Sequence, residues 1–315
     1  MIYLSHIGSF KPNSKISNFD RTTEFDIDKD FIKDKIGVEN IYIKEKNQDT
    51  SDLCLGAFLN LKSKCPNISD QIDCVIVCTQ NPDGNGIPHT SSILHKKLGL
   101  SDDCACFDIS LGCSGYVYGL SILKGFMEEN SFSQGLLFTC DPYSKIIDPL
   151  DKNTSLLFSD AATVTLLSRS TNSTQVTSKF QMSKFLFATR GKEGVALNND
   201  TSSLKMDGRK IFNFAAKEIP IQINNLLNKV NLKFDDIDYF LFHQGSKAIL
   251  DFLQKKISIS EKKIYSNLYE NGNTVSSSIP ILLEELIDDK NSNKIILSGF
   301  GVGLSWATAL LERGE

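Results

Sequence analysis

The chain has 315 residues, a hydrophobic fraction of 41%, a charged fraction of 23% and a formal net charge of −4. These values are typical of a globular protein with two domains or one large duplicated domain, and the negative charge argues against nucleic-acid binding. Residues 1–20 lack a secretion signal, so we expect a cytoplasmic protein. The uncharged run Ile295–Leu311 is Gly-rich and shorter than the roughly 20 residues of a membrane span, so we expect no membrane span.

The first half of the chain contains a helical pattern at residues 51–65 and a short apolar strand at residues 74–78. The two Cys residues of that strand lie four positions apart, on one face, so we expect them to pack in the core. Cys104 and Cys106 form a single C-x-C pair and lack the second pair that a zinc site needs. We therefore expect reduced cysteines and no metal site.

Cys113 lies between a strand that ends at residues 107–109 and a helix predicted from Ser114 to about Asn130. Gly112 and Gly115 allow the sharp turn that this position requires. The free N–H groups and the dipole at a helix N-terminus lower the pKa of a Cys below its usual value of about 8.5. We therefore predict that Cys113 is a nucleophile, the alternative being a buried, unreactive Cys.

The second half repeats the order of the first. A helical pattern at residues 209–229 precedes an apolar strand at residues 239–242. Ile237, just before this strand, matches Ile72 of the first copy, so the two copies are offset by 237 − 72 = 165 residues. Such a repeat is typical of a duplicated α/β protein with mixed or parallel sheets covered by helices. The polar stretch 168–179 separates the two halves, which we place at residues 1–169 and 170–315.

His243 and Asn273 each follow a segment that is predicted to end at a loop. His243 comes directly after the strand at residues 239–242, where α/β folds place their chemistry. Asn273 lies in the turn Asn271–Thr274, ahead of a helix that begins in the Ser276–Ser278 run. A core or surface His and an ordinary turn Asn remain the alternatives for the two residues.

The last motif is the Gly-rich turn Gly299–Trp306, between two predicted strands. Its glycines do not fit a dinucleotide site, because no suitable βαβ unit follows them. Closely spaced glycines let backbone N–H groups approach a ligand, so this turn is suited to form half of an oxyanion hole.

These motifs, in this order, resemble the β-ketoacyl-acyl carrier protein synthase III family of the thiolase superfamily. The resemblance covers essentially the whole chain, and the spacings 243 − 113 = 130 and 273 − 243 = 30 fit the family pattern. The segments that carry it are Gly112–Gly115, Leu157–Ala162, Met206–Phe212, His243–Gln244, Asn271–Thr274 and Gly299–Trp306.

The resemblance implies a five-layered α-β-α-β-α fold of two similar halves, usually found as a homodimer. Cys113 would be acylated by acyl-CoA, and His243 and Asn273 would hold the thioester carbonyl of a malonyl-acyl carrier protein while it loses CO₂. The backbone N–H groups of Cys113 and of the Val302–Gly303 turn would form the oxyanion hole. No permanently bound cofactor is implied, because the CoA thioester is a substrate.

The resemblance also assigns residues to binding. Phe31 and Lys152 stand where the family commonly has a Trp and an Arg around the CoA adenine, and Lys35 stands where an Arg would meet phosphates. Ile87 falls where the family reaches into the acyl pocket of the partner subunit. The basic residues implied at the carrier-protein surface are Lys247, Lys255 and Lys256.

Several departures from the family pattern favour a specialised fatty-acid, secondary-metabolite or glycolipid pathway over the general initiation of fatty-acid synthesis. Gly245 and Ser246 follow His243-Gln244, where the family usually has Ala and Asn. Asn213 and Ala248 stand in place of basic residues of the carrier-protein surface.

Three alternatives remain at this point. An acyltransferase of the same superfamily would use Cys113 and His243 with a non-malonyl acceptor and release no CO₂. A non-catalytic partner subunit should have lost part of the Cys–His–Asn set, which this chain retains. A hydrolase of the Cys–His type fits the chemistry but not the resemblance over the whole chain.

Overall fold

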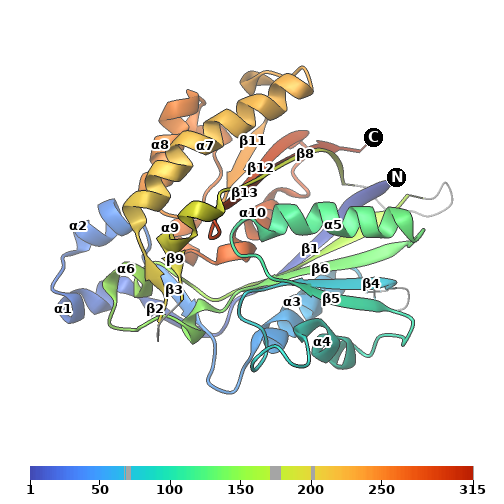
Figure 1. Ribbon diagram of the computed structural model, residues 1–315, viewed down its shortest axis with the longest axis horizontal. Helices are drawn as coiled ribbons and strands as arrows, with labels where there is room; N and C mark the ends of the chain where they lie inside the picture. Colours follow the sequence, from blue (N-terminus) through green and yellow to red (C-terminus); the bar gives the residue numbers. More distant parts are fainter. Residues whose placement is uncertain (67, 69–71, 171–178, 200–202, 315) are drawn as a thin grey trace.

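The computed structural model describes residues 1–66, 68, 72–170, 179–199 and 203–314 (Figure 1). Parts of the first repeat copy and of the polar stretch between the halves, residues 69–71 and 171–178, therefore lie outside the described residues. The strands are β1 (Ile2–Phe10), β2 (Ser14–Ser17), β3 (Asn40–Ile43), β4 (Cys74–Cys78), β5 (Ala105–Ile109), β6 (Gln134–Cys140), β7 (Ala162–Arg169), β8 (Phe180–Thr189), β9 (Leu197–Asn198), β10 (Lys205–Met206), β11 (Tyr239–Phe242), β12 (Lys294–Gly301) and β13 (Ser305–Arg313). The α-helices are α1 (Thr22–Phe25), α2 (Lys29–Phe31), α3 (Thr50–Lys64), α4 (Thr90–Leu98), α5 (Gly115–Glu129), α6 (Lys152–Ser155), α7 (Gly208–Lys229), α8 (Lys247–Ile257), α9 (Leu268–Asn271) and α10 (Ser278–Leu286).

Nine strands form one mixed sheet in the order β11-β12-β13-β8-β1-β7-β6-β4-β5. Within the first half, β4 pairs in parallel with β5 and β6, while β6 and β7, and then β7 and β1, pair antiparallel. The second half repeats this plan, because β11 and β12 pair in parallel, and the pairs β12–β13 and β13–β8 are antiparallel. The two halves meet where β1 pairs with β8 at Tyr3–Gln181 and Leu4–Phe180.

The helices divide into two outer layers and one inner layer (Figure 1). On one outer side, α3 packs on β1 and β7 and α4 packs on β4 and β5; on the other, α7 packs on β8, β12 and β13 and also contacts α8. The inner helices α5 and α10 each contact strands of both halves of the sheet. The five-layered α-β-α-β-α fold is thereby confirmed.

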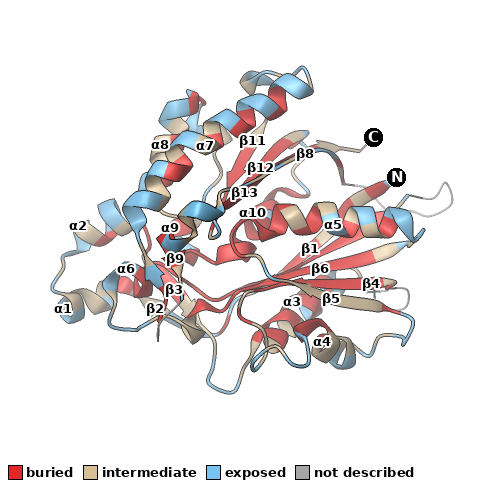
Figure 2. Ribbon diagram, viewed as in Figure 1, coloured by how far each residue is buried: buried red, intermediate tan, exposed pale blue. Residues whose placement is uncertain are grey.

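The strand sequences explain why both faces of the sheet are covered. Side chains alternate between the faces of a strand, so a strand buried on both faces is apolar throughout. In β4 (CVIVC), Cys74, Ile76 and Cys78 pack in the central hydrophobic cluster, while Val75 and Val77 pack in the cluster beneath α3 and α4. Figure 2 shows the buried residues concentrated on the central strands and on the inner faces of the helices.

Helix α5 and helix α10 bring the two halves together at their N-terminal ends. The turn before α5 carries Cys113, and the segment before α10 carries Asn273, with a short helical turn at Val275–Ser277 between. The loop after β11 carries His243. Within the part of the chain that the structure describes, none of the helices has the length and apolar character needed to cross a membrane.

Candidate active site

A cavity of about 580 Å³ brings the three predicted catalytic residues together: Cys113, His243 and Asn273 all line it. They come from three different loops, and each follows a strand or helix at the place that the sequence analysis predicted. Apolar side chains surround them in the cavity wall, notably Leu157, Phe158, Leu197, Met206, Ile211, Ile249 and Phe300.

The chain packs tightly around Cys113. Helix α5 begins two residues later, at Gly115, where an added Cβ would lie 2.3 Å from the sulfur of Cys78. On the opposite side, an added Cβ at Gly301 would lie 2.7 Å from the Cys113 Sγ and 2.8 Å from its Cβ. Gly301 is therefore needed for β12 to approach the nucleophile closely, and Gly115 is needed for the start of α5 to pack against Cys78 of β4.

The expected lowering of the Cys113 pKa by the helix N-terminus is wrong for the free enzyme. Burial, the largest cause, and the negative charge of Asp141 together raise the pKa of the Cys113 thiol to about 12. The backbone N–H groups of Val302 and of Cys113 itself lower the pKa only in part. Loss of hydration thus outweighs the nearby backbone N–H groups, and Cys113 is a thiol at neutral pH.

The same N–H groups support the predicted oxyanion hole. They approach the Cys113 sulfur, as their effect on its pKa shows, and so they lie beside the position of an acyl carbonyl on that sulfur. Val302 and Gly303 lie in the turn between β12 and β13, where Gly303 has a φ of +125°. Such a φ is readily available to Gly and strained for other residues.

His243 is buried and neutral. Burial lowers its pKa to about 3, against a small opposite effect of the Val275 carbonyl. Its Nδ1 lies 2.8 Å from the Ser278 hydroxyl, and its ring meets the Phe300 ring edge-on at 5.6 Å. The Cδ2–Nε2 edge lies against Gly245, which lines the cavity. His243 therefore presents Nε2 to the substrate space.

Asn273 is oriented by its own backbone segment. Its Oδ1 accepts the N–H of Val275 at 2.9 Å, so the Nδ2 group is the end of the amide left for the cavity, with a long contact of 3.4 Å to the Gly245 carbonyl. The Asn273 backbone pairs with Leu157 and Ser159 of the first half. This pairing ties the Asn273 loop to the other half of the chain.

The predicted CoA-binding residues lie around one end of the cavity. Lys35 lines the cavity, as does Asn153, the neighbour of Lys152. The Lys152 ammonium lies 5.9 Å from the centre of the Phe31 ring. The structure therefore brings the predicted pair Phe31 and Lys152 together, in contact with each other rather than lining the cavity itself.

The predicted carrier-protein residues lie on α8. Lys247, in its first turn, binds Asp251 at 2.5 Å and lines a second cavity of about 380 Å³. Lys255 and Lys256 are exposed in its last turn. Pairing with Asp251 reduces the positive charge that Lys247 offers to a partner, which the sequence alone did not indicate.

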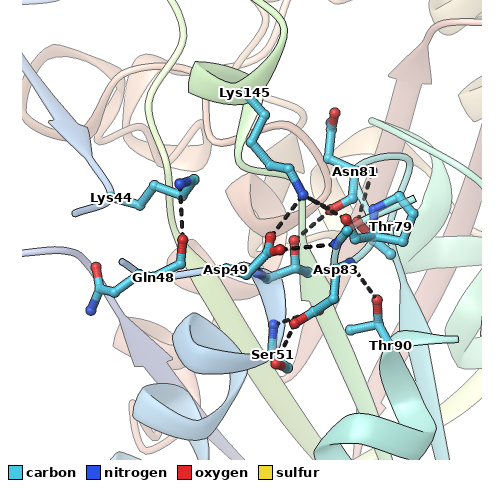
Figure 3. Close-up of polar contacts among 12 residues, drawn as sticks. Lys44, Gln48, Asp49, Ser51, Thr79, Asn81, Asp83, Thr90 and Lys145 are labelled. Atoms are coloured by element: carbon cyan, nitrogen blue, oxygen red, sulfur yellow. Dashed lines mark hydrogen bonds and ion pairs between the residues drawn. The ribbon is translucent and has the colours of Figure 1, made fainter. Parts of the chain in front are cut away.

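Ile87 lies on the loop of residues 79–89, between β4 and α4, which a polar network holds in place (Figure 3). The Lys145 ammonium donates to Asp49 at 2.7 Å and to the Pro82 carbonyl at 2.5 Å. Ile87 itself is 93% exposed and is not among the described residues that line the cavity of its own chain.

Sequence reasoning missed two neighbours of the catalytic residues. Ser278 contacts His243, and Asp141 is a buried carboxylate that accepts hydrogen bonds from the Gln80 N–H at 2.7 Å and the Ser276 hydroxyl at 2.5 Å. Ser278 gave no signal beyond its place at a helix start. Asp141 directly follows an apolar strand, as His243 does, which was a usable signal.

Comparisons with known proteins agree with this geometry. The family model described as 3-oxoacyl-[acyl-carrier-protein (ACP)] synthase III matches residues 107–184, and the model of its C-terminal part matches residues 227–313. The β-ketoacyl-[acyl-carrier-protein] synthase III of Streptococcus agalactiae serotype III is 34% identical over 326 aligned positions, with 98% of each chain covered. The chain belongs to the 3-oxoacyl-(acyl carrier protein) synthase III family.

Two further relatives support the assignment. The β-ketoacyl-[acyl-carrier-protein] synthase III of Lactococcus lactis is 30% identical, with 98% of each chain covered. A crystal structure of a 3-oxoacyl-(acyl-carrier-protein) synthase III superposes with a TM-score of 0.91 at 30% identity, covering 99% of both chains. The protein is therefore an acyltransferase of the condensing type, with the thiolase-like fold that the sequence predicted.

Proposed function

We propose that this synthase transfers an acyl group from acyl-CoA to Cys113 and then condenses it with a malonyl thioester. The observation that carries the proposal is the convergence of Cys113, His243 and Asn273 on one cavity. No permanently bound cofactor takes part, since the CoA thioester is itself a substrate.

The first half-reaction exchanges one thiol for another. The Cys113 sulfur forms a bond to the acyl carbon, the bond from that carbon to the CoA sulfur breaks, and the Cys113 proton leaves with CoA as a free thiol. This proton transfer from Cys113 to CoA suits a nucleophile whose pKa is about 12, because no thiolate has to persist in the free enzyme. The N–H groups of Cys113 and of the Val302–Gly303 turn stabilise the oxyanion.

The second half-reaction builds negative charge on the malonyl thioester. The bond between the α-carbon and the carboxylate breaks and CO₂ leaves. The electron pair of that bond stays on the thioester and forms an enolate. Nε2 of His243 and Nδ2 of Asn273 donate hydrogen bonds to the enolate oxygen. The enolate carbon then attacks the acyl carbonyl on Cys113, and the departing sulfur regains a proton from solvent. A neutral His243 fits this role, since a donor and not a charge is required.

We propose that malonate arrives on acyl carrier protein. The exposed Lys255 and Lys256 on α8, with Lys247 beside them, provide a basic surface for an acidic partner. Lys35, Phe31 and Lys152 would contact CoA at the cavity entrance, with Lys152 providing a cation without the planar shape of an Arg.

We further propose a homodimer. Strand β5 is at the edge of the sheet, and all of its residues are only partly buried. Phe107 of β5 packs on Phe126 of α5 at 5.4 Å, and Ile122 of α5 is 38% exposed. Pairing two copies along β5 would cover this surface and place the exposed Ile87 against the partner's acyl pocket. Measurement of the mass in solution tests this, and a monomer at micromolar concentration would contradict it.

Three finer points stay predictions: a cytoplasmic location, the division into units 1–169 and 170–315, and a specialised pathway. The departures at Gly245 and Ser246 support the last of these, since both residues line the cavity next to His243.

The reaction is tested by incubating the enzyme with radiolabelled malonyl-acyl carrier protein and a panel of acyl-CoAs. We expect release of CO₂ together with a β-ketoacyl product, and mass spectrometry should locate the acyl intermediate on Cys113. Acylation of Cys113 without release of CO₂ from any malonyl thioester would contradict condensation and favour transfer to another acceptor.

A further inference from the structure

The role of His243 depends on which ring nitrogen carries its proton. A neutral imidazole has one N–H, and the partner of one nitrogen decides the state of the other. With the proton on Nε2, His243 and Asn273 both donate into the cavity. With the proton on Nδ1, the cavity holds one acceptor and one donor, and the enolate loses one of its two hydrogen-bond donors.

The Ser278 hydroxyl is the side-chain contact of Nδ1. Its oxygen lies 2.8 Å from Nδ1, 3.0 Å from the Val275 carbonyl and 3.4 Å from the Gln244 N–H. The Gln244 N–H can only donate, so it uses one lone pair of the hydroxyl oxygen. The single hydroxyl proton must then go either to Nδ1 or to the Val275 carbonyl.

Two observations favour Nδ1. The Val275 carbonyl already accepts the backbone N–H of Ser278 at the start of α10. Nδ1 is the closer of the two acceptors, and it lies fully buried with His243. In the competing arrangement, Nδ1–H donates to the Ser278 oxygen or to the Val275 carbonyl. The Val275 carbonyl lies close enough to raise the pKa of His243. The two arrangements are mutually exclusive and distinguishable by experiment.

Val275 links both catalytic residues to this arrangement. It has a φ of +52°, in the left-handed region that β-branched residues rarely adopt. In that conformation its N–H fixes the Asn273 amide, and its carbonyl receives the Ser278 N–H. One strained residue thus orients the Asn273 donor directly and positions Ser278 beside His243.

We infer that Ser278 is a positioning residue that donates to Nδ1 of His243 and thereby keeps the imidazole proton on Nε2, facing the substrate. The inference rests on the proposed function, because the Nε2 proton matters only if His243 stabilises the enolate. It leaves the acylation of Cys113 independent of Ser278.

The direct test is nitrogen NMR of the imidazole rings. The chain has four His residues, so assignment by single substitutions is practical. We expect the His243 spectrum of the full-length enzyme to show the proton on Nε2. In Ser278→Ala we expect a mixture of tautomers or the Nδ1–H form. Ser277→Ala is the matched control, since the Ser277 hydroxyl is equally buried at the same helix start but donates to the Thr139 carbonyl at 2.9 Å.

The kinetic test separates the two half-reactions. Ser278→Ala should slow CO₂ release from malonyl-acyl carrier protein by about 10- to 100-fold and change Cys113 acylation by less than about 2-fold. Ser277→Ala should leave the ratio of the two rates unchanged, and Ser278→Thr should restore CO₂ release at least in part. An Nδ1–H form in the wild-type enzyme, or an unchanged tautomer in Ser278→Ala, would overturn the inference. Absence of CO₂ release from the wild type would instead contradict the proposed function and leave the NMR result standing.

Discussion

Replacing Gly301 by Ala should slow the acylation of Cys113 by about 100-fold while the protein still folds. The added methyl carbon would lie 2.7 Å from the Cys113 sulfur and 2.8 Å from its Cβ. Ordinary contacts between such atoms are roughly 3.5–4.0 Å, so one side must move by about 1 Å. Rotation of the Cys side chain brings no relief, because the Cβ is as close as the sulfur. A displacement of about 1 Å at a reacting atom costs on the order of 100-fold in rate.

The assay is the rate at which an acyl group appears on the intact protein after mixing with acyl-CoA, together with the thermal unfolding midpoint. Overpacking at Gly301 should reduce the free energy of unfolding by about 1–3 kcal/mol. Gly125→Ala is the matched control, because it lies on α5, the helix that follows Cys113, and an added Cβ there meets nothing within 4 Å. It should stabilise the enzyme by roughly 0.5–1 kcal/mol and acylate normally. A folded Gly301→Ala enzyme that acylates at the wild-type rate would refute the reasoning.

Three further results are expected. Alkylation of Cys113 in the free enzyme should accelerate with pH beyond pH 9, because its pKa is about 12, and a plateau below pH 9 would contradict the effect of burial. Burial raises the folded-state pKa of Asp141 from 3.8 to about 6. The protonated side chain therefore stabilises the folded state at low pH, and this contribution to the free energy of unfolding is lost as the pH rises through 6. In chemical denaturation, the free energy of unfolding of Asp141→Asn, measured relative to that of the wild type, should therefore rise by about 1.4 kcal/mol from pH 5 to pH 8. A difference that stays constant with pH would show that Asp141 does not titrate in this range. Lys145→Met should speed hydrogen exchange in the loop of residues 79–89 by about 5-fold, because the lost contacts of the partly exposed Lys145 stabilise the closed loop by about 1 kcal/mol. Unchanged exchange would mean that Lys145 does not hold this loop in place.

The convergence of the catalytic residues was predictable because each follows a recognisable element. Cys113 lies between a strand and a helix, and His243 directly follows an apolar strand, so elementary topology places both at one end of the sheet. The repeated order of helix and strand likewise predicted two similar halves. These features depend on short-range patterns that a sequence displays directly.

The electrostatics of the site were not predictable in the same way. The Cys113 pKa is set by burial beneath β12 and by Asp141, both far from Cys113 along the chain. The partner of His243 is Ser278, which is 278 − 243 = 35 residues away and looks like any Ser at a helix start. Local patterns place a side chain in the fold, but its pKa and hydrogen bonds depend on tertiary neighbours.

The central claim is a division of labour, in which Cys113 holds the acyl group while His243 and Asn273 stabilise the attacking enolate. The most direct test uses His243→Ala, first acylated with acyl-CoA and then mixed with malonyl-acyl carrier protein, with intact-protein mass spectrometry at successive times. The account predicts that the acyl group forms on Cys113 and then remains there, whereas the wild-type enzyme loses it as product. Loss of the acyl group from His243→Ala at the wild-type rate would contradict the account.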